Sequence, residues 1–320
     1  MTTENTAVGR YASQPSHIPW LGWKAILTRV YKTIGNADIS LRCAGVAFFG
    51  FLSIFPVMAC FVLIYGLFST GTSLQEHLSV IREFAPGSVY EILEERLQAL
   101  LSQPEVGLGV GLIISFCLAL WSGSRGTNSL ISTVSESYRE PEERGFLAAA
   151  ILSVGLTLGG LFFVLVALFA IAAIPVIVAT LPFPATAETI ALWVRWPLLA
   201  AMVWVALTIL YRLAPNRKGA QWKWITPGSA VATVLWIAAS VGFSIYVEQF
   251  GNYGATFGSL SVVVVMMLWI YYSTMIIAIG AALNAEMEHQ TKIDTTTGPA
   301  APMGMRGAHV ADHLPEQSAS

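Results

Sequence analysis

Six stretches of this chain carry almost no charge, and each is long enough to cross a lipid bilayer. They are residues 44–68, 107–130, 146–181, 191–213, 225–250 and 257–285. A helix rises about 1.5 Å per residue, so roughly 20 apolar residues span the hydrocarbon core. Because the bilayer offers no water to unpaired backbone groups, such stretches must be helical. The sequence therefore predicts an all-α, multi-pass membrane protein with six transmembrane helices.

Composition and charge restrict the function classes further. Apolar residues make up 55% of the chain and charged residues only 11%, whereas about 25% of residues are charged in a typical soluble domain. A chain of 320 residues with six spans has no room for a separate soluble domain of normal size. The net charge of −2 gives no reason to expect nucleic acid as a partner. The three cysteines lie in or beside apolar stretches and are expected to be buried thiols.

The basic residues fall unevenly on the two sides of the predicted membrane domain. The segment before the first span, the second-to-third and fourth-to-fifth connections and the tail hold 14 of the 17 lysines and arginines. The other side keeps Arg82, Arg96 and Arg195. Since cytoplasmic loops carry the excess of basic residues, both termini are predicted to be cytoplasmic.

Two segments outside the spans are predicted on the cytoplasmic side before the first span. Residues 1–19 are expected to be flexible. Residues 20–43 are expected to form an amphipathic helix in the membrane interface, held by tryptophan and by anionic lipid. Its apolar face contains Trp20, Trp23, Leu27, Val30, Tyr31 and Ile34, with Lys24, Arg29 and Lys32 off that face. The same pattern also fits a helix packed on the membrane domain, and this alternative stays open.

Two further segments complete the predicted organisation. Residues 72–103 are expected to form an external cap of two short amphipathic helices, separated by Pro86-Gly87. The cytoplasmic tail, residues 286–320, is expected to be disordered, because it is rich in Thr, Pro, Gly and Ala and has little to bury.

Three positions are predicted to act as structural hinges. Pro56 lies near the middle of the first span and removes a backbone hydrogen bond, so a kink is expected there. Gly254 and Gly258 lie in a glycine-rich turn on the outer side, between the last two spans.

The polar residues Ser124, Arg125 and Asn128 stand at the predicted cytoplasmic end of the second span. An arginine at membrane depth is a functional candidate, and small polar neighbours could share one anion with it. Arg125 is therefore a candidate to bind a lipid phosphate or a substrate carboxylate. The alternative is that Arg125 only anchors the helix on its positive side.

Three further residues are candidates to line a substrate pathway. Glu248 ends the fifth span, Tyr253 follows it, and Asn284 closes the sixth span. For Glu248, a structural ion pair with Arg195 is the alternative. No catalytic residues, metal or cofactor are predicted. Glu286 and His289 have a spacing found in carboxylate-bridged metal sites, but such sites need a second copy and the sequence has none.

The order of several motifs resembles the YihY/virulence factor BrkB family over about residues 20–290. The motifs are Ala47–Pro56 (AFFGFLSIFP), Tyr65–Phe68 (YGLF), Trp121 with Ser124–Gly126, Trp224–Gly228 (WITPG), Tyr253-Gly254 with Gly258–Leu260, Trp269 and Gly280–Glu286 (GAALNAE). Two positions depart from the family pattern. Ala282 stands where the family usually has glutamate, and Ser135 where an asparagine is common before the retained Tyr138.

This resemblance implies a bacterial inner-membrane protein with six spans and no settled activity. Some relatives carry the label ribonuclease BN, but the sequence has neither clustered metal ligands nor a cytoplasmic segment long enough for a nuclease domain. We expect a non-enzymatic protein that transports or translocates a small solute or lipid in support of the cell envelope. An envelope scaffold without transport activity is the alternative. The expected partners are membrane lipids, an unidentified small solute or lipid as substrate and, in a homo-oligomer, further copies of the chain.

Overall fold

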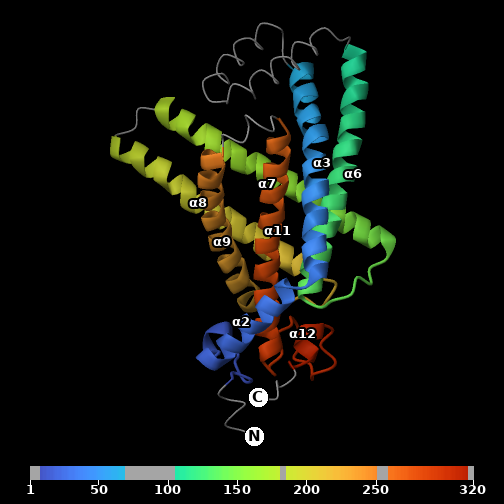
Figure 1. Cartoon of the computed structure of the whole chain (residues 1–320), viewed down its shortest axis with the longest axis vertical. Coiled ribbons are helices and arrows are strands. Elements are labelled where there is room, and N and C mark those ends of the chain that lie inside the picture. The colour runs from blue at the N-terminus through green and yellow to red at the C-terminus, as the bar shows by residue number, and fades with distance from the viewer. Residues whose placement is uncertain (1–7, 69–104, 181–184, 251–258, 316–320) are drawn as a thin grey trace. The chain divides into compact units, whose positions relative to one another are not determined.

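The computed structural model describes residues 8–68, 105–180, 185–250 and 259–315 (Figure 1). Six described helices have the length and apolar composition to cross a membrane. They are α3 (Ala37–Phe68), α6 (Glu105–Ser137), α7 (Phe146–Thr180), α8 (Ala185–Leu213), α9 (Trp222–Phe250) and α11 (Ser259–Gln290). No β-strand is formed by the described residues, which contain one isolated bridge. The predicted all-α fold with six spans is confirmed.

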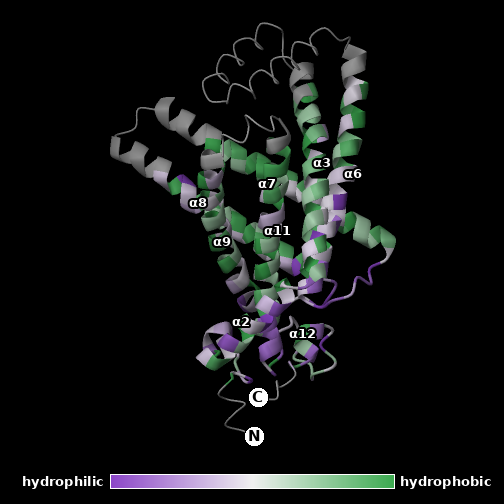
Figure 2. Cartoon of the chain, viewed as in Figure 1, coloured by the Kyte–Doolittle hydropathy of each residue, from purple (hydrophilic) through white to green (hydrophobic). Residues whose placement is uncertain are grey.

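Three of the helices extend beyond the apolar stretches predicted from the sequence, all at the same end of the membrane spans. α3 begins at Ala37 rather than at residue 44, and α6 ends at Ser137 rather than at residue 130. α11 likewise continues to Gln290. These extra turns are polar and carry the ion pairs described below, so hydropathy alone does not detect them. We call this end of the molecule, formed by α2 (Trp20–Ile34), the last turns of α11 and the short helix α12 (His309–Asp312), the terminal end. Figure 2 shows hydrophilic residues gathered there.

The chain divides into two compact units. The smaller unit, Phe48–Arg125, contains most of α3 and the first part of α6. Within it, Gly111 faces Leu63, so α6 approaches α3 at a residue without a side chain. α3 runs without interruption through Pro56, and the kink predicted there stays a prediction. The larger unit, Met1–Ala47 with Gly126–Ser320, contains all the other elements.

The core of the larger unit is the crossing of α9 and α11, which α8 joins. A Cβ atom on Gly228 would lie 2.3 Å from the carbonyl oxygen of Gly280, and one on Gly280 would lie 2.4 Å from the Tyr211 hydroxyl. Only glycine permits such close backbones. The Asn284 side chain accepts a hydrogen bond from the Gly228 amide at 2.8 Å, and Tyr211 donates to the Ile277 carbonyl at 2.8 Å. This crossing is therefore closely packed and hydrogen-bonded.

The segment predicted as one helix over residues 20–43 is two helices. α2 (Trp20–Ile34) ends at Gly35, and α3 begins two residues later at Ala37. α2 packs against α11 with Ile26 and Val30 buried. The predicted apolar face is thus divided, because Trp20 and Tyr31 are exposed while Val30 is not.

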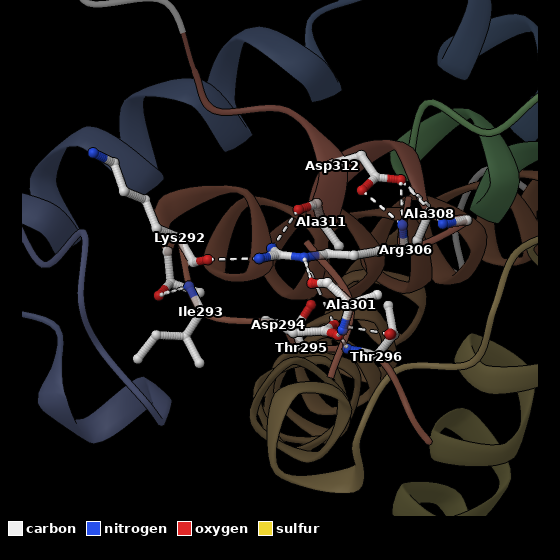
Figure 3. A network of polar contacts seen from close by, with 12 residues as sticks. Lys292, Ile293, Asp294, Thr295, Thr296, Ala301, Arg306, Ala308, Ala311 and Asp312 are labelled. Carbon is white, nitrogen blue, oxygen red and sulfur yellow. Dashed lines mark hydrogen bonds and ion pairs between the residues drawn. The ribbon is translucent and has the colours of Figure 1, made fainter. Parts of the chain in front are cut away.

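The tail also differs from its prediction. Residues 291–315 fold at the terminal end and include the short helix α12 (His309–Asp312). The buried Arg306 guanidinium donates to the carbonyls of Lys292, Ala301 and Ala311 at 2.7–3.1 Å (Figure 3). Asp312 accepts hydrogen bonds from the amides of Gly304, Arg306 and Gly307. Two charged side chains therefore order a segment whose composition indicates disorder.

Several predictions fall outside the described residues. These are residues 1–7 of the segment 1–19 that was predicted to be flexible, the external cap predicted at 72–103, and the last five residues of the tail.

Candidate functional site

A network of charged side chains around two buried carboxylates joins five parts of the chain at the terminal end. Its centre is Glu286, near the end of α11, whose carboxylate is bound by Arg29 of α2 at 2.5 Å and by Arg139, which follows α6. His289 lies 3.5 Å from the same carboxylate, and Arg139 contacts the His289 ring at 3.0 Å. Arg29 also donates to Gln290 at 2.7 Å. The Glu286 side chain is only 2% exposed, so its charge is balanced by protein and not by water.

A second carboxylate, on Glu288, binds the loop between α8 and α9. Arg217 donates to Glu288 at 2.6 Å, and both side chains are almost fully buried. The Thr295 hydroxyl of the tail donates to the same oxygen at 2.8 Å. The Arg217 guanidinium lies over the Tyr138 ring, 4.9 Å from its centroid. We call this set the terminal clamp; it consists of Arg29, Tyr138, Arg139, Arg217, Glu286, Glu288, His289 and Gln290.

The electrostatics of the clamp keep Arg217 and Tyr138 in fixed protonation states. Burial alone would lower the pKa of Arg217, but the paired Glu288 and the nearby Tyr138 raise it above its ordinary value. Burial raises the pKa of the Tyr138 hydroxyl, and the Glu288 charge raises it further. Neither group therefore exchanges a proton near neutral pH. This arrangement suits a structural connection more than acid–base chemistry.

Asn284 is part of the packed core. Its side chain is fully buried, and its oxygen is used by the Gly228 amide. The Tyr138 hydroxyl lies close to the Asn284 amide, but no described residue completes an ordinary hydrogen bond with Tyr138 Oη or Asn284 Nδ2. The bond from Gly228 to Asn284 holds α9 against α11, and the predicted role of Asn284 in a substrate pathway stays a prediction.

The two family departures also lie in buried surroundings at this end. Ala282 packs in an apolar cluster with Ile26 of α2 and Met287. Ser135 is buried in the last turn of α6. At position 282 the methyl group contributes to the α2–α11 contact, where a glutamate would bring a charge into an apolar cluster.

Arg125 lies much deeper in its helix than the sequence suggested. α6 continues for 12 residues beyond it to Ser137, which is about 18 Å of helix. Two residues further along, Thr127 bonds Thr157 of α7 at 2.8 Å. Thr157 is itself 11 residues, or about 16 Å, from the start of α7 at Phe146. Arg125 thus lies within the candidate span Gly109–Ser137, and Thr157 lies within the candidate span Phe146–Ile171.

The neighbours predicted for Arg125 differ in their surroundings. Arg125 and Asn128 are exposed and lie one helical turn apart, whereas Ser122 is buried and donates to the Leu118 carbonyl at 2.7 Å. Ser124 is intermediate in exposure. Within the described part of the chain, no hydrogen bond or ion pair joins Arg125 to another residue.

The remaining predicted site residues lie on α9 or beyond it. Glu248 belongs to the last turn of α9, and its side chain lies outside the described part of the structure. Tyr253, Gly254 and Gly258 fall in residues 251–258, which are not described. Over the described ranges, no three His, Cys, Asp or Glu side chains come close enough to hold a metal ion.

Sequence reasoning missed most of the clamp. The sequence marks three of its residues as cytoplasmic cations through the basic bias used for orientation: Arg29, Arg139 and Arg217. That bias does not show which carboxylate each arginine pairs with. Glu288 gave none, because a carboxylate after a span is ordinarily solvated.

Comparison with known proteins agrees with the motif order. The model of the family described as virulence factor BrkB matches residues 30–303. The chain belongs to the virulence factor BrkB family. Similar proteins of this kind include the putative ribonuclease-like protein YfkH of Bacillus subtilis, which is 30% identical over 260 residues. That match covers 79% of this chain and 91% of the Bacillus protein.

Other BrkB-type relatives match over shorter stretches. A UPF0761 membrane protein of Vibrio cholerae is 32% identical over 101 residues, covering 31% of this chain and 33% of that protein. A UPF0761 membrane protein of Idiomarina loihiensis is 30% identical over 96 residues, covering 30% and 34%. No solved structure matches the chain. The comparisons support a membrane protein, in agreement with the six spans.

Proposed function

We propose that this protein is a bacterial inner-membrane protein that moves an anionic solute or lipid across the membrane in support of the cell envelope. The observation that carries the proposal is Arg125, an exposed cation deep in a transmembrane helix with no ion pair among the described residues. A charged residue at the bilayer centre costs about 3 kcal/mol or more unless water, a counter-ion or a lipid phosphate meets it. Such residues mark pathways in membrane proteins.

The chemistry of the guanidinium supports an anion as substrate. Its planar fork binds carboxylate or phosphate through two parallel hydrogen bonds. Asn128, one turn along α6, offers an amide that could donate to the same kind of group. The alternative role as a positive-side anchor fits less well, because Arg139 and Arg144 follow Arg125 and lie beyond the end of α6.

The test is transport by purified protein in proteoliposomes. One arm measures dithionite-accessible NBD-phosphatidylglycerol, which reports lipid translocation. The other arm measures efflux of radiolabelled inorganic phosphate and succinate. We expect activity in at least one arm, lost in Arg125→Ala and weakened in Arg125→Lys, which keeps the charge but not the fork.

Arg195→Ala is the matched control, because it removes another arginine of a transmembrane helix. Arg195 contacts the Ile171 carbonyl and the Trp196 ring, and its loss should leave transport unchanged. Absence of activity in both arms of the wild type, with full insertion, would favour the envelope-scaffold alternative. The proposal assigns no catalysis to the chain, so RNA incubated with the protein should remain intact.

A further inference from the structure

α2 presents two opposite faces with different surroundings. The inner face is buried against the end of α11 through Ile26 and Val30, with Trp23 and Ile34 partly buried beside them. Gly22 on the same face is covered by Val8 and Ile18 of the segment before α2. The outer face is turned away from the protein. It consists of Trp20, Leu21, Lys24, Leu27, Thr28, Tyr31 and Lys32, all exposed. At 100° per residue these seven positions fall within about 140° of the helix surface.

The outer face has the composition of a membrane-interface helix. Four of its side chains are apolar or aromatic and strongly exposed: Trp20 74%, Leu21 57%, Leu27 52% and Tyr31 82%. Its two charges are lysines, and α2 contains no acidic residue. Tryptophan and tyrosine favour the headgroup level, and lysines above it attract anionic lipid.

The packing of α2 sets its level along the molecule. Its inner face joins an apolar cluster with Trp224, in the first turn of α9, and with Leu283 and Met287, near the end of α11. Those helices are membrane spans that begin or end there. α2 also leads directly into the span of α3, with only Gly35 and Asn36 between them. α2 therefore lies at the level where these spans begin or end.

Arg29 is not available to lipid, although the sequence groups it with the two lysines. It lies on the inner side and binds Glu286 and Gln290. The terminal clamp thus fixes the rotation of α2 about its axis, and this rotation leaves Lys24 and Lys32 on the outer face. Among the described residues, no carboxylate forms an ion pair with either lysine.

We infer that the outer face of α2 is a binding surface for anionic phospholipid of the leaflet at the terminal end. Trp20, Leu27 and Tyr31 enter the headgroup region, and Lys24 and Lys32 contact lipid phosphates. The inference concerns a lipid surface and is independent of the transport role proposed for Arg125.

Photocrosslinking of the full-length protein in nanodiscs tests this directly. p-Benzoylphenylalanine replaces Tyr31 on the outer face, and Trp23 on the inner face as the matched aromatic control. Nanodiscs contain either phosphatidylcholine alone or an equal mixture with phosphatidylglycerol. We expect a lipid adduct from position 31 that is enriched in phosphatidylglycerol, and little lipid adduct from position 23.

The lysines are tested in the same assay with Lys24→Gln and Lys32→Gln. Each lysine near an anionic surface should contribute a roughly fivefold preference, so the double variant should lose the enrichment. Lys223→Gln, which removes the same charge from α9, should retain it. A crosslink from position 31 to a second copy or another protein instead of lipid would overturn the inference. Equal adducts from both positions, or enrichment unaffected by the double variant, would also overturn it.

Discussion

At the residue scale, buried charges are the most sensitive positions in this molecule. Glu286→Gln removes the buried carboxylate that balances Arg29 and Arg139, whose side chains are 20% and 36% exposed, so both cations lose their counter-charge. We expect a loss of about 3 kcal/mol in stability, seen as a lower melting temperature of the purified protein. Glu136→Gln is the control, because its pair with Arg42 is more than one-third exposed on both sides and should contribute at most about 1 kcal/mol. Equal shifts for both variants would contradict the clamp.

A second residue-scale prediction concerns close backbone approach. Gly280→Ala places a methyl group 2.4 Å from the Tyr211 hydroxyl and 2.7 Å from the Gly228 carbonyl, so α9 must move away from α11. We expect a loss of about 2 kcal/mol or more. Gly155→Ala in α7 has no atom within 4 Å of the new methyl group and should be neutral or slightly stabilising. Thermal unfolding of the two variants makes the comparison, and a stable Gly280→Ala protein would refute the packed crossing.

At the element scale, the tail depends on a few charged side chains rather than on an apolar core. Burial would raise the pKa of Asp312, but hydrogen bonds from the Arg306, Gly304, Ala308 and Gly307 amides lower it below its ordinary value near 3.8. Asp312 therefore stabilises the folded tail fully above pH 3.8, and this contribution is lost as the pH falls through the lowered pKa. Asp312→Asn should release the tail at neutral pH, with trypsin cleavage after Arg306 as the readout. If trypsin cut the wild-type tail as fast as the Asp312→Asn tail, the tail would not be folded against the rest of the protein.

The elements also show what a sequence can and cannot predict. The six spans were predictable because a long apolar stretch has one stable conformation in lipid. The break between α2 and α3 at Gly35-Asn36 was missed, because an amphipathic pattern continues through it. The order of the tail was missed because it comes from Arg306 and Asp312, which bind backbone groups of the tail. Neither composition nor residue pattern reveals such contacts. Arg125 was found as a candidate, but its depth depends on the polar turns that extend α6 to Ser137.

At the scale of the whole molecule, the predicted orientation decides on which side of the membrane the terminal clamp and the proposed lipid-binding face of α2 lie. The basic bias predicts that the terminal end lies in the cytoplasm. A cysteine replacing Lys218, in the loop held by the tail, should therefore resist impermeant thiol reagents applied to intact cells. A cysteine at Ser88 or Asn252, which the charge rule places outside, should react. The reverse pattern would invert the orientation and move the α2 surface to the outer leaflet.

We propose that Arg125 faces a water- or headgroup-filled pathway inside the membrane. The most direct measurement is the reaction of Arg125→Cys, in a background lacking the native cysteines, with a membrane-impermeant anionic thiosulfonate. Phe162→Cys is the control, since Phe162 is 69% exposed on the apolar α7 and should face lipid. We expect the cysteine at 125 to react readily and the one at 162 to remain unmodified. A cysteine at 125 as unreactive as the control would show that no such pathway reaches this residue.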